Sequence, residues 1–129
     1  MDIGIVRGRL KPCRDSPNCV GSMYPQDEKH YMKPWFYHLE RSEVIEHLLD
    51  MIRSERGTEI KEVKENYIHA VYTIPFFGYK DDLEFYMPDS GNVIHFRSAS
   101  RVGYYDFGVN KRRINRLRKK LANLSIVTI

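Results

Sequence analysis

Residues 97–113 contain side chains that could bind an anion, and a functional site is expected in this segment. It joins a predicted strand to a predicted helix through a loop punctuated by Gly103 and Gly108. Serine hydroxyls, backbone N–H groups at a helix start and arginines are groups that proteins use to hold phosphate or carboxylate. The candidate ligand-binding residues are Arg97, Ser98, Ser100, Arg101, Asn110 and Arg113.

The same segment also has a purely structural interpretation. Gly103 and Gly108 would then adopt backbone angles that other residues avoid. Asn110 would cap the helix, and the arginines would pair with Asp82 and Asp106. The segment has neither the Walker glycine-lysine pattern nor the glycine pattern of dinucleotide-binding folds, and both interpretations stay open.

Asp81 and Asp82 are the candidate catalytic residues. Paired carboxylates perform general acid–base chemistry when their environments separate the two pKa values. Strand alternation, however, directs neighbouring side chains to opposite faces of a sheet. Asp82 is then predicted to meet Arg97 across the strands, and Asp81 to find Arg101, Arg113 or loop amides. An ion network that holds the loop to the sheet is the competing interpretation.

Cys13 and Cys19 are separated by five residues of a turn-rich segment. We favour a structural, redox-silent pair, and a disulfide is the next interpretation. A zinc site would need two histidines to complete it, and a nucleophile would need a neighbouring base that the sequence does not indicate. No metal site and no cofactor are therefore expected.

The elements that position these residues follow from apolar periodicity. One helix is predicted to begin at Ser42 and to end before Gly57, and a second to cover residues 110–124. The second helix has a predicted buried stripe formed by Ile114, Leu117, Leu121 and Leu124. Four strands are expected between the helices, near residues 58–64, 67–74, 81–87 and 92–99.

A tight turn at residues 88–91 would set the pairing of the last two strands. Leu83 would then face Phe96 on the core side, and Asp82 would face Arg97 on the outer side. This register places apolar pairs on one face and opposite charges on the other.

We therefore predict a single α+β domain over residues 1–129. Residues 41–129 would form a helix, a four-stranded antiparallel meander and a basic C-terminal helix, with both helices on one sheet face. Residues 1–40, which hold four prolines, both cysteines and an aromatic stretch, would form an irregular arm packed on this domain. The outer sheet face could also be covered by a second copy, so a homodimer is possible.

The net charge of +4 is unevenly distributed. Residues 97–120 contain nine Lys and Arg residues and one acid, Asp106, which leaves a net negative charge on the rest of the chain. Such a segment attracts nucleic acid, phosphorylated metabolites or an acidic protein surface. No stretch approaches the ~20 apolar residues of a membrane span. The first residues lack an apolar signal core, and a cytoplasmic location is expected.

Four stretches resemble the domain-of-unknown-function family numbered 1499, which occurs in bacteria and plants. They span nearly the whole chain in the family's order and are Leu10–Val20, His30-Tyr31 before Pro34, Asp81–Phe85 and Arg97–Arg113. The resemblance implies no agreed activity, substrate or catalytic residue. Many family members look exported or membrane-tethered.

Three functions are consistent with these observations. The first is a non-enzymatic binding or accessory module that recognises an anionic molecule or an acidic protein surface through residues 97–113. The second is an enzyme acting on a phosphorylated or carboxylated small molecule, with Asp81 and Asp82 assisted by Arg97 and Arg101. The third is nonspecific nucleic-acid binding by the basic helix.

Overall fold

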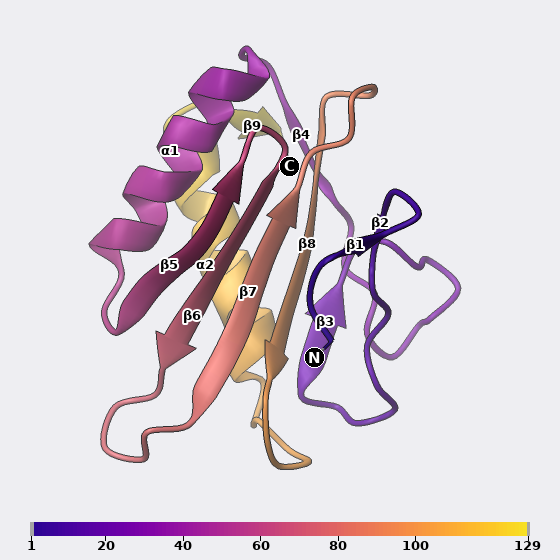
Figure 1. Ribbon diagram of the computed structural model, residues 1–129, viewed down its shortest axis with the longest axis vertical. Helices are drawn as coiled ribbons and strands as arrows, with labels where there is room; N and C mark the ends of the chain where they lie inside the picture. Colours follow the sequence, from indigo (N-terminus) through magenta and orange to yellow (C-terminus); the bar gives the residue numbers. More distant parts are fainter. Residues whose placement is uncertain (1, 129) are drawn as a thin grey trace.

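A seven-stranded antiparallel sheet with both helices packed on one face dominates the computed structural model, which describes residues 2–128 (Figure 1). The helices are α1 (Arg41–Ser54) and α2 (Val109–Asn123). The strands are β1 (Ile5–Val6), β2 (Arg9–Leu10), β3 (Cys19–Gly21), β4 (Trp35–Tyr37), β5 (Thr58–Lys64), β6 (Tyr67–Thr73), β7 (Lys80–Tyr86), β8 (Val93–Ser100) and β9 (Val127–Thr128). The order in the sheet is β5-β6-β7-β8-β4-β9, with β3 also paired to β8, and β1 and β2 form a separate two-stranded sheet.

The predicted four-stranded meander is wrong, because the sheet has seven strands. Strands β5 to β8 do pair consecutively, but β3, β4 and β9 extend the sheet beyond them. Strands β3 and β4 come from residues 1–40, which were expected to be irregular. Strands of two or three residues are too short to show alternation in the sequence. They form by pairing with other segments, β3 and β4 with β8, and β9 with β4.

The register between β7 and β8 differs from the prediction by two residues. Glu84, rather than Asp82, faces Arg97, and Phe85, rather than Leu83, faces Phe96. The connection between the two strands is longer than the tight turn on which the prediction depended. A shift of two residues leaves every side chain on its predicted face, because side chains alternate with a period of two.

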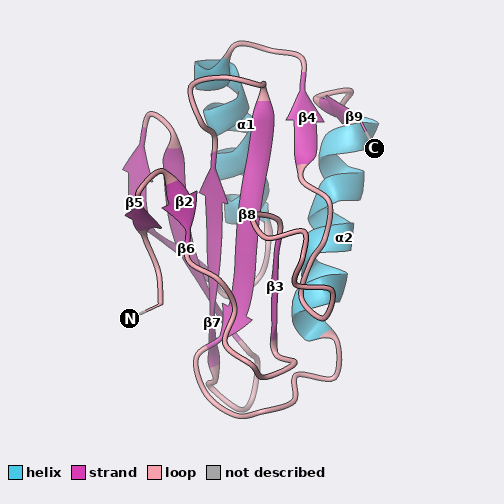
Figure 2. Cartoon of the chain, turned by 90° about the vertical axis from the view of Figure 1, so that its right-hand side faces the viewer, coloured by secondary structure: helices cyan, strands magenta, loops and turns pink. Residues whose placement is uncertain are grey.

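The core lies between the helices and one face of the sheet (Figure 2). Trp35 of β4 packs against Phe85 and Phe96, with ring centroids 5.5 and 5.1 Å apart. The helices contribute the buried side chains Val44, Ile45, Leu48, Leu49, Met51, Ile52, Ile114, Leu117 and Leu121. Leu124 was predicted to belong to this stripe, but it is 64% exposed because α2 ends at Asn123.

The start of α2 is capped by Asp106 rather than by Asn110. Gly108 stands at the N-cap position with φ of 79°, in the left-handed region that glycine tolerates. The Asp106 carboxylate accepts hydrogen bonds from the backbone N–H groups of Gly108 and Asn110, at 2.9 and 3.1 Å. Asp106 thus caps the helix, a role that was predicted for Asn110.

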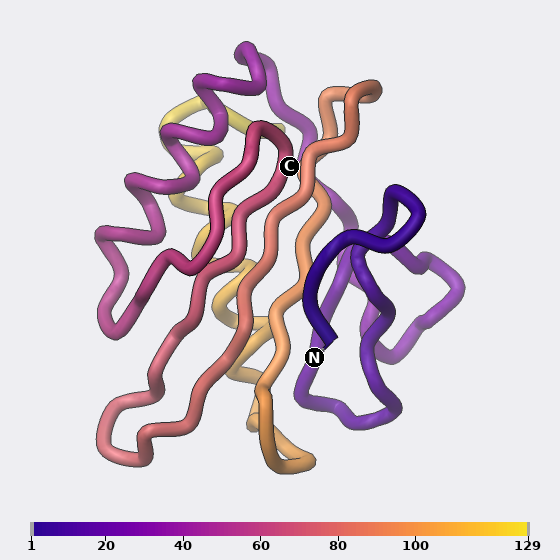
Figure 3. The backbone as a smooth tube through the Cα atoms, in the orientation of Figure 1, coloured from indigo at the N-terminus to yellow at the C-terminus, as the bar shows by residue number. Residues whose placement is uncertain are grey.

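The N-terminal segment lies over the outer face of the sheet beside β7 and β8 (Figure 3). Leu10 packs there with Tyr67 and Tyr86 in a small second apolar cluster. These two tyrosines are therefore buried. Neither helix in residues 2–128 has the length and apolar character that crossing a bilayer requires.

Candidate functional site

A polar cavity of about 190 Å³ lies on the outer face of the sheet, where β8 ends. One wall comes from the start of β7, from β8 and from the following loop, and the other comes from the N-terminal segment. The lining residues are Asp2, Arg14, Ser16, Asn18, Cys19, Asp82, Arg97, Ala99, Ser100, Arg101 and Gly103.

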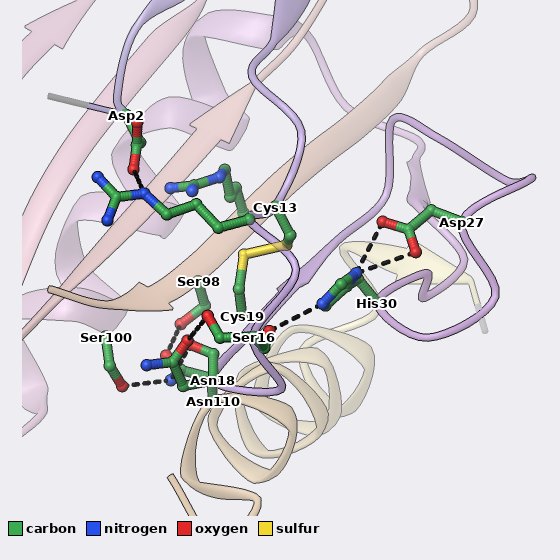
Figure 4. The surroundings of a disulfide bond; sticks show 12 residues. Asp2, Cys13, Ser16, Asn18, Cys19, Asp27, His30, Ser98, Ser100 and Asn110 are labelled. Atoms are coloured by element: carbon green, nitrogen blue, oxygen red, sulfur yellow. Dashed lines mark hydrogen bonds and ion pairs between the residues drawn. A yellow bond between two sulfur atoms is a disulfide. The ribbon is translucent and has the colours of Figure 1, made fainter. Parts of the chain in front are cut away.

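A disulfide between Cys13 and Cys19 closes the loop that forms the N-terminal wall (Figure 4). The structure thus has the disulfide, which was the second interpretation of the two cysteines, in place of the favoured redox-silent pair. Within the closed loop, the Asn18 side chain donates a 2.8 Å hydrogen bond to the Gly103 carbonyl. The Ser100 N–H donates to the Asn18 carbonyl at 2.9 Å. These bonds join the two walls of the cavity.

His30 braces the same loop from behind. Its Nε2 lies 2.9 Å from the Ser16 carbonyl oxygen, and its Nδ1 lies 2.8 Å from a carboxylate oxygen of Asp27 (Figure 4). A carboxylate on one ring nitrogen fixes the orientation of the imidazole. His30 therefore positions the wall of the cavity.

Arg97 lines the cavity with a buried guanidinium group. The residue is only 4% exposed, and its Nε has no hydrogen-bond partner in residues 2–128. Its Nη1 lies 3.8 Å from Oε1 of Glu84, beyond hydrogen-bond distance. A buried cation is expected to make several charge-assisted hydrogen bonds, so Arg97 retains unused donor capacity.

Glu84 is fully buried and makes its hydrogen bonds through one oxygen. Oε2 accepts from the Tyr67 hydroxyl at 2.6 Å and from the Gly4 N–H at 2.7 Å, and Oε1 has no hydrogen-bond partner. Burial raises the pKa of Glu84 above its ordinary value, although these two hydrogen bonds and the charge of Arg97 oppose the shift. The ion pair with Arg97 is consequently weak.

Asp82 forms a closer set of contacts on the floor of the cavity. Arg101 donates two 2.9 Å hydrogen bonds to its carboxylate, and His69 Nε2 lies 2.7 Å from Oδ1. Burial alone would raise the pKa of Asp82, but the hydrogen bonds from His69 and Arg101 prevail and lower it to about 2. Asp82 is therefore ionised at neutral pH and holds Arg101 at the cavity.

Asp81 lies on the other face of the sheet, in a buried network that joins β7, β8 and α2. Arg113 donates to Asp81 at 2.7 Å and to Asn110 Oδ1 at 2.7 Å, and it stacks over the Tyr72 ring at 4.2 Å. Ser98 also donates to Asn110, at 2.7 Å. Asp81 and Asp82 thus face different environments on opposite sides of one strand.

The predicted ligand-binding residues therefore divide into two groups. Arg97, Ser100 and Arg101 line the polar cavity, whereas Ser98, Asn110 and Arg113 belong to the buried network. The cavity also uses residues that sequence reasoning did not select as a site, namely Asp2, Arg14, Ser16, Asn18 and Glu84 behind Arg97. A register that allowed for the longer connection after β7 would have placed Glu84 opposite Arg97. No local sequence pattern indicates that residues 2–18 lie beside β8.

Three cations of α2 form ion pairs with two carboxylates. Arg113 pairs with Asp81, and Arg116 and Lys120 both reach Glu55, each at 2.6 Å. Burial alone would raise the pKa of Glu55, but the hydrogen bonds from Arg116 and Lys120 help to lower it to about 2. The charge that the helix offers to a polyanion is reduced accordingly.

A family model described as "Protein of unknown function (DUF1499)" matches residues 9–121. No curated protein and no solved structure is detectably similar to the chain. The matched range includes the disulfide loop, α1, most of α2 and the greater part of the polar cavity.

Proposed function

This chain belongs to the DUF1499 family of proteins of unknown function, and we propose that it is a non-enzymatic binding module for a small anion. The ligand is a carboxylate or a phosphate group, held in the polar cavity between the disulfide loop and the end of β8. An anionic small molecule fits this cavity better than an acidic protein surface does, because the principal cation, Arg97, is buried rather than displayed.

The observation that supports this proposal most strongly is the incomplete hydrogen bonding of Arg97. A guanidinium group presents five N–H donors in a planar fork that matches carboxylate and phosphate oxygens. Arg97 is 4% exposed, its Nε has no partner in residues 2–128, and Glu84 lies too far away to accept a hydrogen bond. An anion in the cavity would satisfy these donors and would balance the charge.

The surrounding side chains suit the same ligand. Arg101 is held at the cavity by Asp82, and Arg14 stands at the opposite wall in an ion pair with Asp2. Ser16 contributes a hydroxyl group to the lining. Three arginines against two carboxylates leave the lining with a positive charge, which favours an anionic ligand.

The enzymatic and nucleic-acid alternatives have less support. Asp81 and Asp82 are both engaged in ion pairs, and the low pKa of Asp82 makes its carboxylate a poor base at neutral pH. Tyr67 and Tyr86 of the outer sheet face are buried beneath the N-terminal segment, so their rings are not available to stack with bases.

We also infer that the protein works in an oxidising compartment, in place of the cytoplasm expected from the sequence. The Cys13–Cys19 disulfide supports a wall of the proposed binding cavity. Disulfides persist in secreted and periplasmic proteins and are generally reduced in the cytosol. Alkylation of free thiols in cells, followed by mass measurement, tests this inference, and a fully alkylated pair would contradict it.

Calorimetric titration with inorganic phosphate and, separately, with succinate tests the proposed anion binding. We expect saturable binding of at least one of them, with an affinity that falls at least tenfold in Arg14→Gln. Arg14 is suitable because its side chain is 72% exposed, so its replacement leaves the core intact. Arg97→Gln should abolish binding, with the folded state verified by circular dichroism.

Arg56→Gln is the matched control, since Arg56 is also an exposed arginine but lies in the turn between α1 and β5. It should bind as the unmodified protein does. Absence of binding by the folded unmodified protein, or an equal loss of affinity in Arg14→Gln and Arg56→Gln, would overturn the proposal.

A further inference from the structure

Exposed apolar side chains are concentrated in two loops at one end of the molecule. These loops, 74–79 between β6 and β7 and 101–108 between β8 and α2, lie at the lower end in Figure 1 and remain together in Figure 2. Seven of the eleven exposed large apolar side chains in residues 2–128 lie here, and they are Phe76, Phe77, Tyr79, Val102, Tyr104, Tyr105 and Phe107. We call these seven residues the aromatic loop surface.

Two phenylalanines in this surface point into solvent from unfavourable backbone conformations. Phe76 has φ of 72° and is fully exposed, and Phe107 has φ of 54° and is 87% exposed. A bulky residue in the left-handed region is strained, and such strain is a reason to look for a function. Neither ring contributes to the buried core, so packing does not explain these conformations.

The two loops enclose an open apolar groove of about 730 Å³. Apolar side chains line most of it, whereas Asp81, Ser100 and Asp106 are its polar residues. Exposed apolar areas of this kind mark interaction sites in soluble proteins. The remaining lining residues are Ile74, Phe77, Tyr79, Val102, Gly103, Tyr105, Phe107 and Val109.

Basic residues border the aromatic loop surface. Lys80 begins β7, Arg101 is the first residue of the second loop, and Lys111 and Arg112 lie in the first turn of α2. Asp106 is the single acid within the two loops, and its carboxylate is occupied by capping α2. The end of the molecule therefore combines exposed aromatic rings with a positive charge.

We propose that the aromatic loop surface docks on a membrane surface that contains anionic lipids. Aromatic side chains partition into the interfacial zone of a bilayer, where the ring is in apolar surroundings and the polar tip of tyrosine stays hydrated. Basic residues beside them add attraction to anionic headgroups. This docking surface is separate from Arg97 and goes beyond the proposed anion binding.

The shape of this surface favours a bilayer over a folded protein partner. The exposed apolar side chains belong to two loops at one end of the molecule rather than to a sheet or helix face, and Figure 3 shows the backbone course of these loops. Exposed rings of this kind can enter the headgroup layer together, and Lys80, Lys111 and Arg112 then lie near the headgroups. A folded partner would instead need a matching cavity for each ring.

Vesicle flotation tests the proposal. We expect the protein to float with vesicles of phosphatidylcholine and phosphatidylglycerol at low salt, and to float far less with phosphatidylcholine alone. The double variant Phe76→Asn/Phe107→Asn should lose at least tenfold in partition coefficient, because asparagine tolerates both backbone conformations but lacks the ring. Lys111→Gln should reduce binding by about fivefold, as expected for one basic residue near an anionic surface.

Leu124→Ser is the matched control, since Leu124 is 64% exposed but lies at the opposite end of α2. It should float as the unmodified protein does. A Phe77→Trp variant should show tryptophan quenching by brominated lipid, whereas Trp35 is buried and should not respond.

Three results would overturn the proposal. The first is absence of flotation with the anionic vesicles, and the second is an equal loss of flotation in the phenylalanine variant and in Leu124→Ser. The third is a concentration-dependent dimer, measured by sedimentation without lipid, that Phe76→Asn/Phe107→Asn abolishes, because it would assign the surface to a second copy of the chain.

Discussion

Glu84 and Arg97 face each other across β7 and β8, yet their closest charged atoms stay 3.8 Å apart and Glu84 Oε1 has no hydrogen-bond partner. Opposite charges buried this completely normally form close, fully hydrogen-bonded pairs. The separation leaves the guanidinium group beside the polar cavity only partly neutralised. Anion affinity should therefore depend on the ionisation of Glu84.

Replacing Glu84 by Gln should increase the affinity of the cavity for sulfate several-fold at pH 7. Glutamine can still accept hydrogen bonds from Tyr67 and Gly4, but it removes the negative charge that competes with the ligand for Arg97. Because burial raises the pKa of Glu84, the unmodified protein should bind sulfate more tightly as pH falls and Glu84 becomes neutral.

Calorimetric titration with sulfate from pH 8 to pH 5 measures both effects, since sulfate keeps a constant charge over this range. Glu84→Gln should show a weaker pH dependence than the unmodified protein. Unchanged sulfate affinity in a folded Glu84→Gln protein would show that Glu84 does not compete with the ligand for Arg97.

Glu55 should make the protein sensitive to acid. Its pKa is about 2 in the folded state against an ordinary value of 4.5, and that of Asp82 is about 2 against 3.8. A lowered carboxylate pKa stabilises the fold above the ordinary value, and this contribution is lost as pH falls from about 4.5 towards 2. Urea unfolding at pH 7, 4, 3 and 2 should give a free energy of unfolding that becomes progressively smaller as the pH falls.

The variant Glu55→Gln isolates the contribution of that carboxylate. We expect it to lower the free energy of unfolding at pH 7 by roughly 1–3 kcal/mol, because Arg116 and Lys120 lose their charged acceptor. The difference from the unmodified protein should shrink at pH 2. Glu59→Gln, which alters an exposed pair with Lys61 on β5, should change stability little.

Removal of the Asn110 side chain should destabilise the fold strongly. Asn110 is fully buried, accepts hydrogen bonds from Ser98 and Arg113, and donates to the Asn18 carbonyl. Asn110→Ala removes these buried hydrogen bonds from a network that includes the charged Arg113, and we expect a loss of roughly 2–4 kcal/mol by chemical denaturation. Asn115→Ala, at a partly exposed position of the same helix, should stay within about 0.5 kcal/mol of the unmodified protein.

Reduction of the disulfide should weaken both the fold and the cavity. Cys13 and Cys19 are six positions apart, and closing so short a loop is worth about 2 kcal/mol in the chain-entropy account. Thermal melts with and without dithiothreitol should differ by several degrees. Phosphate affinity should also fall, because Asn18 would no longer be held against Gly103.

The double variant Cys13→Ala/Cys19→Ala provides the control for this experiment. It should melt at the temperature of the reduced protein and should not respond to dithiothreitol. A change of melting temperature with dithiothreitol in this variant would show that the reductant acts on something other than the disulfide.

Relief of backbone strain should make Phe76→Asn more stable than the unmodified protein. Asparagine adopts the left-handed conformation with less strain than phenylalanine, and the exposed ring contributes no core packing. We expect a gain of up to about 1 kcal/mol in chemical denaturation. Phe77→Asn is the matched control, because Phe77 is exposed but does not have a positive φ, and it should gain nothing.

The sequence predicted well those elements that are long enough to show a period. Helix α2 was expected over 110–124 and occupies Val109–Asn123, and the four strands between the helices lie within one residue of the predicted ranges at every end. Even with an incorrect register, Asp82 and Arg97 were assigned to the outer face, because a shift of two residues preserves the alternation. Membership of the family was also correctly identified.

The features that the sequence did not predict depend on contacts between segments that are distant along the chain. Strands β3 and β4 each have three residues and form by pairing with distant segments, β3 with β8 and β4 with β8 and β9, so no local pattern indicated them. The same contacts bring Arg14 and Asn18 to the polar cavity. For Asp106, the capping position was missed because Gly108 begins the helix in an unusual conformation that spacing alone does not indicate.

The pairing of strand β8 with both near and distant segments implies an order of folding. On one edge it pairs with β7, its neighbour along the chain, and on the other it pairs with β3 and β4, which lie far earlier in the sequence. Local hairpins close quickly, whereas contacts over long chain separations form slowly. Refolding from denaturant should therefore assemble the β5–β8 sheet before the N-terminal wall of the cavity, and competence to bind an anion should appear after most of the β-sheet signal has returned.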